Sequence, residues 1–461
     1  MKTNFSVIQL QNPKFAESDK ILKSCQHYGF CTSGCPTYVL LRDERDSPRG
    51  RIDLIKDMLE KGGAPDPKTV EHLDKCLSCG SCMTTCAVKV DYAHLIDHAR
   101  EHIEQHYKRP FQERLLRSLI AFTVPRPAVF RLAVRLASVT RPLASILPRR
   151  FRPLFELSRT ELPQSHALQS YYPAAGSRKY RVALLGGCAQ QVLAPEINQA
   201  TIRLLTQAGC DVVIPQSAGC CGSLALHMGR AGEAKRQARR NIESWSAEID
   251  RENLDAILVN ASGCGTTLKE YGHLFADEAD IASAAARVSQ MAMDVTEWLV
   301  RLDLSALQAP AVSYSVVYHD PCSMRNVQKV TAPPRKLLRA AGYVVSDVPE
   351  GHFCCGSAGT YNMLQPDIAR QLGDRKARNL ESTGASLGAT ANIGCLTQIR
   401  QYTEMPMLHI LQLLDWAYGG PLPPQLQGVE LKKMERSAEA DTYAVSLLGN
   451  DPRSEDSAAI W

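Results

Sequence analysis

The chain has 461 residues and a formal net charge of +5. This length suits two or three domains, and so small a net charge gives no reason to expect a nucleic-acid partner. Sixteen cysteines are far more than packing requires, but a disulfide framework is typical of short secreted chains, and the N-terminus lacks the apolar core of a signal peptide. No apolar run approaches the roughly 18 residues of a transmembrane helix. We therefore expect a cytoplasmic protein whose thiolates hold metal.

Residues 1–105 are predicted to form a helical ferredoxin-type domain with two iron–sulfur clusters. Four cysteines share the spacing C-x2-C-x2-C-x3-C: Cys76, Cys79, Cys82 and Cys86. In this spacing three thiolates hold one cubane and the fourth reaches a neighbouring cluster. An upstream group offers three more thiols: Cys25, Cys31 and Cys35. The upstream group is incomplete, because Tyr28 stands where its second ligand belongs.

The usual crossover between two such groups predicts the ligands of each cluster. One 4Fe-4S cubane is expected on Cys35, Cys76, Cys79 and Cys82. The other cluster is expected on Cys25, Cys31 and Cys86.

This second cluster leaves one iron without a thiolate. The phenol of Tyr28 is a poor ligand, because its pKa of about 10 must fall before it binds iron. His27 could ligate the iron, but it stands one residue away from the ligand position. Loss of the whole cluster is a further alternative. We favour a three-iron, four-sulfide cluster, as in iron–sulfur subunits of the succinate dehydrogenase type. Arg49 and Arg51 either offset the charge of a cluster or are ordinary surface arginines.

Residues 106–178 are predicted to form a basic helical arm and a linker. Eleven lysines and arginines between Lys108 and Arg152 meet a single acid, Glu113, and prolines divide the stretch into short helices. Such an arm can contact an anionic membrane surface, dock on an acidic partner subunit, or remain solvated.

Two α/β units are expected at 179–300 and 301–420, because short apolar strands alternate with helical periods. Their cysteines repeat at offsets of 134, 134, 134 and 131 residues, which indicates an internal duplication. The fold class is thus a helical domain followed by a duplicated α/β cysteine-rich domain. Residues 421–461 are predicted to be a flexible tail.

Each repeat places four cysteines after strand ends, where ligands gather in open α/β sheets. The first quartet is Cys188, Cys220, Cys221 and Cys264. The second quartet is Cys322, Cys354, Cys355 and Cys395. Either can bind zinc or an iron–sulfur cluster, and spacing does not separate the two. Cys210 has no repeat partner and is expected in the core. His319 either serves a cluster, by donating a proton or a hydrogen bond, or is satisfied by backbone.

The doubled C-x31-C-C-G motif behind a tandem ferredoxin module resembles the cysteine-rich CCG family. That family includes subunits of heterodisulfide reductase, anaerobic glycerol-3-phosphate dehydrogenase and glycolate oxidase. The resemblance is strongest to the glycolate oxidase iron–sulfur subunits, over the strings at 30–38, 47–52, 124–130, 262–265, 354–361 and 390–395.

This resemblance implies an electron-transfer subunit of a glycolate dehydrogenase. Flavin-bearing partner subunits would oxidise glycolate to glyoxylate, and this chain would pass the electrons towards a quinone at the inner face of the cell membrane. Three alternatives remain: an iron–sulfur subunit for D-lactate or glycerol-3-phosphate, a catalytic subunit of the heterodisulfide reductase type, and a zinc-stabilised scaffold.

Overall fold

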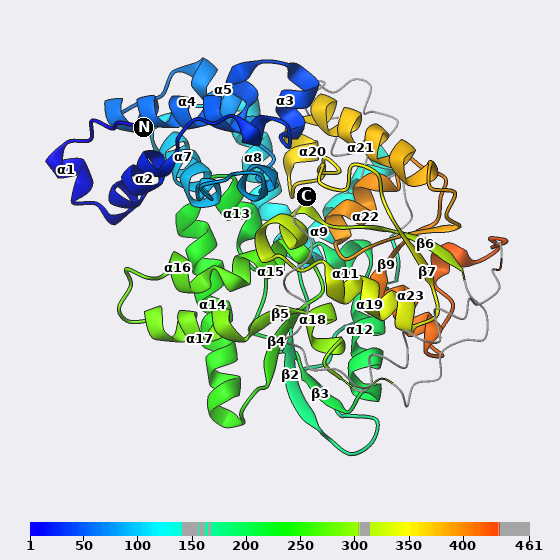
Figure 1. Cartoon of the computed structure of the whole chain (residues 1–461). Coiled ribbons are helices and arrows are strands. Elements are labelled where there is room, and N and C mark those ends of the chain that lie inside the picture. Colours follow the sequence, from blue (N-terminus) through cyan, green and yellow to red (C-terminus); the bar gives the residue numbers. More distant parts are fainter. Residues whose placement is uncertain are drawn as a thin grey trace.

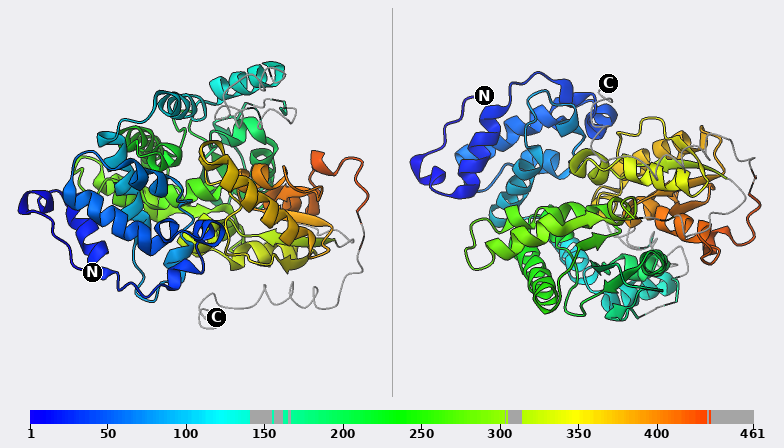
Figure 2. Two further views of the ribbon diagram at one scale, coloured as in Figure 1. Left: turned by 90° about the horizontal axis from the view of Figure 1, so that it is seen from above. Right: turned by 60° about the horizontal axis from the view of Figure 1, so that its bottom comes forward.

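The computed structural model describes residues 1–140, 155, 162–164, 167–302, 304, 314–431 and 433. A helical N-terminal part is followed by two α/β units (Figure 1). The N-terminal helices lie across one end of both α/β units, as the views in Figure 2 also show. Within the described ranges, none of the helices is both long enough and apolar enough to span a bilayer.

The N-terminal domain consists of short helices connected by the cysteine-bearing loops. They are α1 (Val7–Leu10), α2 (Pro13–Ser24), η1 (Phe30–Thr32), α3 (Pro36–Leu41), η2 (Glu44–Asp46), α4 (Pro48–Lys61), α5 (Pro67–Asp74), α6 (Ser81–Thr84) and α7 (Tyr92–His106). Proline starts several of them, at a position where its missing N–H costs no helical hydrogen bond. Their apolar faces share one core around Leu22, Ile55 and Leu95. The predicted helical domain is confirmed.

Two amphipathic helices, α8 (Phe111–Thr123) and α9 (Pro127–Thr140), follow this domain. One face of the pair packs on the body of the protein, where Leu116 and Phe130 are buried. A fully solvated arm is therefore wrong for these helices. Residues 141–154 of the predicted arm lie outside the described residues.

The first α/β unit contains a five-stranded sheet. Its elements are β1 (Tyr171–Tyr172), β2 (Tyr180–Leu184), α11 (Gln190–Leu193), α12 (Glu196–Gln207), β3 (Cys210–Val213), α13 (Ser223–His227), α14 (Ala231–Arg251), β4 (Ala256–Val259), α15 (Ser262–Lys269), α16 (Tyr271–Leu274), α17 (Ala282–Met291), β5 (Ala292–Asp294) and α18 (Val295–Leu299). The strand order is β1-β3-β2-β4-β5, and only β1 is antiparallel to its neighbour. The predicted linker thus supplies an edge strand, with Tyr171 paired to Val213.

The second α/β unit repeats this arrangement. Its elements are β6 (Ser315–His319), η5 (Ser323–Gln328), α19 (Ala332–Ala340), β7 (Val344–Asp347), α20 (Tyr361–Leu364), α21 (Pro366–Glu381), β8 (Leu387–Thr390), α22 (Ile393–Ile399), β9 (Met407–His409), α23 (Ile410–Ala417) and η6 (Pro424–Leu426). The order β7-β6-β8-β9, all parallel, matches β3-β2-β4-β5 of the first unit. The predicted duplication and the α plus α/β fold class are confirmed.

The two repeats share a hydrophobic core. Side chains of both sheets, such as Leu184 and Tyr318, belong to one buried cluster, and Cys210 packs there as expected for a core thiol. An ion pair between Arg203 Nη2 and Asp415 Oδ2 (2.6 Å) joins α12 to α23. Leu426 is buried in the same core, so the predicted flexible tail is wrong for its first residues. Residues 434–461 lie outside the described residues.

Candidate iron–sulfur and thiolate sites

Four thiols of the N-terminal domain converge: Cys35, Cys76, Cys79 and Cys82. Cys35 caps the start of α3, and the other three lie in the stretch that leads from α5 into α6. The left-handed residues Ser78 (φ 49°) and Gly80 (φ 68°) turn this loop. Burial raises the pKa of the Cys79 and Cys82 thiols well above the usual range, and nearby thiols add to the shift. This donor set fits a metal cluster, whose positive charge stabilises thiolates.

A buried cation, Arg51, lies beside this thiol group. Its side chain is 1% exposed, and its Nη1 lies 3.9 Å from Cys35 Sγ. Nη2 lies 3.4 Å from Asp46 Oδ1, which is also buried. Burial opposes the positive charge, but the surrounding thiols raise the pKa of Arg51 above its usual range. Arg51 is therefore placed to offset cluster charge, whereas the side chain of Arg49 is partly exposed and pairs with Glu44 (Nε–Oε1, 2.5 Å).

Three further thiols line a second pocket: Cys25, Cys31 and Cys86. Burial raises the pKa of the Cys31 thiol to about 11, and the other two thiols add to the shift. Tyr28 lines the same pocket, yet it is 62% exposed. The Nε2 atom of His27 lies 3.6 Å from Asp53 Oδ1, so this imidazole already has an acidic neighbour. The structure thus brings together the thiols of each predicted cluster.

The four thiols of the first repeat meet at the carboxyl edge of its sheet. Cys188 follows β2, the Cys220–Cys221 pair follows β3, and Cys264 lies in the first turn of α15 after β4. Hydrogen bonding with Cys220 raises the pKa of the Cys188 and Cys221 thiols, and burial adds to both shifts. Because those two thiols donate to it, the pKa of Cys220 is lowered. Four adjacent sulfurs here fit a thiophilic metal centre.

The glycine of each Cys-Cys-Gly motif has a steric reason. Gly222 and Gly356 have φ of 93° and 90°. A Cβ atom would lie 2.9 Å from Ala234 O at the first and 2.6 Å from Ala369 O at the second. Only glycine therefore lets each thiol pair lie so close to its long helix, α14 or α21.

The thiols of the second repeat form an equivalent row: Cys322, Cys354, Cys355 and Cys395. The Sγ atoms of Cys322 and Cys354 are 3.7 Å apart. Asn392 Nδ2 donates to Cys395 Sγ (3.4 Å). All sixteen cysteines are described and are free thiols, so both quartets are available to a metal.

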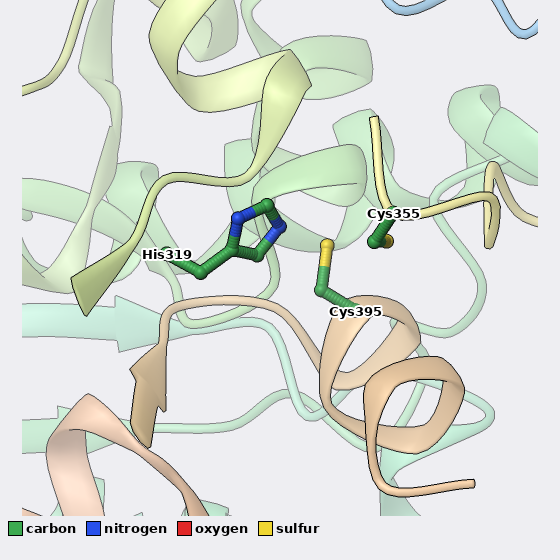
Figure 3. A group of neighbouring side chains, drawn as sticks. All are labelled: His319, Cys355 and Cys395. Carbon is green, nitrogen blue, oxygen red and sulfur yellow. The ribbon is translucent and has the colours of Figure 1, made fainter. Parts of the chain in front are cut away.

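His319 lies at the end of this row, with its ring directed towards Cys395 and Cys355 beyond (Figure 3). One ring nitrogen and the two sulfurs all lie within 4.8 Å of one another. Burial lowers the pKa of His319 well below its usual range. Backbone satisfaction of His319, one of the sequence-based alternatives, is wrong: within the described part of the chain neither ring nitrogen has a hydrogen-bond partner.

The N-terminal domain contacts the second quartet directly. Cys79 packs in a buried cluster with Cys354 and Cys322. Asn326, in η5 just after Cys322, donates from Nδ2 to Cys79 O (2.9 Å). Tyr361 Oη donates to Lys75 O (2.9 Å).

Family models match both parts of the chain. A 4Fe-4S dicluster domain matches residues 21–90, and a cysteine-rich domain, CCG, matches residues 182–269 and 316–400. The chain is 41% identical to the glycolate oxidase iron-sulfur subunit of Escherichia coli strain K12, over 90% of this chain and 99% of that protein. The chain belongs to the family of glycolate oxidase iron–sulfur subunits.

Two further proteins are similar to this chain. The probable glycolate oxidase iron-sulfur subunit of Bacillus subtilis is 34% identical over 87% of this chain and 93% of its own length. Lactate utilization protein A of Bacillus licheniformis is 30% identical but matches only 51% of this chain and 99% of its own length. The resemblance found in the sequence is confirmed, and the matched domains imply that this chain binds iron–sulfur clusters.

Sequence reasoning missed three polar residues around the second quartet. Lys376 is 1% exposed, and its charge interacts with the thiols of Cys354, Cys355 and Cys395. The sequence held a signal, because Lys376 lies on the buried stripe of α21 among apolar residues. Asn392 and Asn326 carry no comparable signal, since their roles depend on neighbours that only folding brings near.

Proposed function

We propose that this chain is the electron-transfer subunit of a glycolate dehydrogenase. Flavin-bearing partner subunits would oxidise glycolate to glyoxylate, and this chain would pass the electrons to a membrane quinone. Iron–sulfur clusters supply one-electron carriers when bound, and the protein fixes their spacing and surroundings. Family membership supports the role, and the arrangement of the thiols supports the direction.

The observation that carries the proposal is the buried contact between Cys79 and the Cys322–Cys354 pair. It joins the predicted cubane site of the N-terminal domain to the second repeat. The thiols Cys221 and Cys264 of the first repeat pack instead among residues of their own repeat. We therefore place the second repeat on the electron path.

We assign the entry of the electrons to the second thiol pocket of the N-terminal domain. Tyr28, Phe30 and Val88 are 62%, 61% and 40% exposed at or beside this pocket. Apolar side chains around an exposed redox site suit a protein partner. We assign this surface to the flavin-bearing subunit.

We assign the exit of the electrons to the side of α8 and α9 that would face the membrane. Away from the body of the protein, these helices expose a row of apolar residues: Phe111, Leu115, Leu119, Phe122, Leu132, Leu136 and Val139. Arginines flank the row, and Arg126 lies 4.4 Å from the Phe122 ring centroid. In the left view of Figure 2, α9 (cyan) forms an outer edge of the molecule. An apolar face bordered by cations fits an anionic membrane surface, with the chain peripheral to it.

A cavity of about 940 Å³ opens between α5, α8 and the α20–α22 segment. Ala369, which packs in the same buried cluster as Cys354, lines it together with Met363 and Leu364. A quinone ring with part of its tail fits a cleft of this size. We expect Leu364→Trp to narrow the cavity and slow quinone reduction without affecting electron entry.

The decisive experiment uses the assembled complex with Cys322→Ser and, as a matched variant, Cys188→Ser. With glycolate as donor, the N-terminal clusters should become reduced in both variants, as followed by EPR. Quinone reduction should be lost in Cys322→Ser. Full quinone reduction in an assembled, cluster-loaded Cys322→Ser complex would contradict the proposed path, and so would zinc without iron in the cysteine-rich repeats. Quinone reduction measured with glycolate, D-lactate or glycerol-3-phosphate as donor tests which substrate the complex oxidises.

A further inference from the structure

His319 has no hydrogen-bond partner in the described part of the chain, although it is 1% exposed. An unpaired polar group in a protein interior is costly, so such a group calls for a partner. A ring nitrogen of His319 lies within 4.8 Å of both Cys355 Sγ and Cys395 Sγ. Figure 3 shows the imidazole on β6 directed at the sulfur of Cys395, which rises from α22.

The first repeat has an apolar residue at this place. Cys188 and Cys322 are equivalent by the 134-residue offset, which makes Leu185 the counterpart of His319. Leu185 is 2% exposed and belongs to an apolar cluster. The fold therefore accepts leucine at the strand end, and the histidine of the second repeat is not required by packing.

Two further polar residues surround the second quartet. Asn392 donates to Cys395 Sγ (3.4 Å), and its counterpart by the 131-residue offset is Ala261. The buried ammonium of Lys376 interacts with three thiols of the quartet. The second site thus has an amide that donates to a thiol and an imidazole beside two thiols, where the first repeat has Ala261 and Leu185.

We propose that His319 is a nitrogen ligand of the iron–sulfur cluster held by the second repeat, whereas the first repeat offers sulfur alone. This inference rests on the proposed function, which places an iron–sulfur cluster in the second repeat. Neutral imidazole in place of thiolate raises the potential of iron–sulfur centres. The centre of the second repeat is therefore more easily reduced than that of the first. This property suits a centre that receives electrons from the N-terminal clusters, whose thiols it contacts.

The test uses the assembled complex with histidine labelled by ¹⁵N, and two substitutions. His319→Leu installs the residue of the first repeat, and His319→Cys replaces nitrogen by sulfur. His409→Gln is the control, because His409 is equally buried but caps α23 instead of facing thiols. Iron counts, pulsed EPR of the reduced complex and redox titration are compared.

We expect strong coupling from a histidine nitrogen in the wild type and in His409→Gln, and its loss in both His319 variants. His319→Cys should retain its iron and show a lowered potential at one centre, while the N-terminal signals stay unchanged and report correct folding. Coupling that persists in His319→Leu would overturn the inference, as would its absence from an iron-loaded wild type. Loss of zinc with unchanged iron in Cys395→Ser would show zinc in the second repeat, and would overturn the electron path and the inference together. Iron without nitrogen coupling overturns only the inference.

Discussion

Replacing the buried Arg51 by glutamine should lower the reduction potential of the cluster predicted on Cys35, Cys76, Cys79 and Cys82. Reduction adds negative charge to a cluster, and the guanidinium stabilises that charge. Glutamine retains hydrogen-bonding capacity but removes the positive charge. The reduced state therefore loses more stabilisation than the oxidised state.

The size of the effect follows from the distance of 3.9 Å between Arg51 Nη1 and Cys35 Sγ. At an effective dielectric constant of about 20, unit charges this far apart interact by about 4 kcal/mol. Charge on a cluster is spread over several atoms, which roughly halves the interaction to about 2 kcal/mol. This corresponds to a decrease on the order of 80 mV for one electron.

Stability falls in the same variant. Asp46 is buried, and it retains Lys75 Nζ at 3.5 Å and His72 Nδ1 at 2.9 Å after Arg51 is removed. A buried charge left without any partner costs about 3 kcal/mol or more, so the two remaining partners of Asp46 should keep the loss below that value. The protein should therefore be prepared cold, and its iron content compared with that of the wild type before titration.

The assay is an EPR-monitored redox titration of the assembled complex, with Arg49→Gln as matched control. Arg49 lies on the same helix, but its side chain is 39% exposed, is paired with Glu44 and lines the pocket of Cys31 instead of contacting Cys35. Solvent screening should therefore hold its effect on the potential of the Cys35 cluster below about 20 mV. Equal shifts in the two variants, at equal iron content, would refute the charge-compensating role of Arg51.

Three further predictions follow from other sites. Tyr28→Cys should add about one iron per chain and abolish a three-iron EPR signal of the oxidised protein; an unchanged signal would contradict the three-iron assignment. His94 Nδ1 and Nε2 contact Asp91 (2.6 Å) and Glu270 (3.1 Å), and despite opposing burial these contacts raise its pKa to about 10. A raised histidine pKa stabilises the fold fully below about pH 6.5, and this stability is lost as the pH rises through about 10. Calorimetry should show that the free energy of unfolding falls by about 2 kcal/mol over this pH range. His94→Gln should abolish this fall. Leu119→Glu should weaken binding to anionic vesicles about tenfold or more, whereas the equally exposed Leu422→Glu should not.

The strand ends and the paired thiols could be predicted because the repeat offset fixes their positions along the chain. The contact of Cys79 with Cys322 could not, since it depends on how two separate domains dock. Lys376 was overlooked because a lysine within a helix is usually solvated, and only tertiary packing buries it. The strand β1 could not be predicted, because two residues are too few to show a periodic pattern. It forms by pairing with the edge of β3.

The second repeat connects the other two thiol-bearing parts of the chain. Asn326, in the π-helical segment η5, donates to Cys79 O (2.9 Å) on the N-terminal domain. In the same segment, Ser323 Oγ donates to Ser262 Oγ (2.9 Å), at the start of the helix that carries the fourth thiol of the first repeat. π-Helical turns are frequent at functional sites, and this one directly follows Cys322. The two quartets are equivalent by the repeat, but it is the thiols of the second that pack against Cys79 of the N-terminal domain. The segment η5 therefore lies between the second quartet and both of the other thiol-bearing parts of the chain.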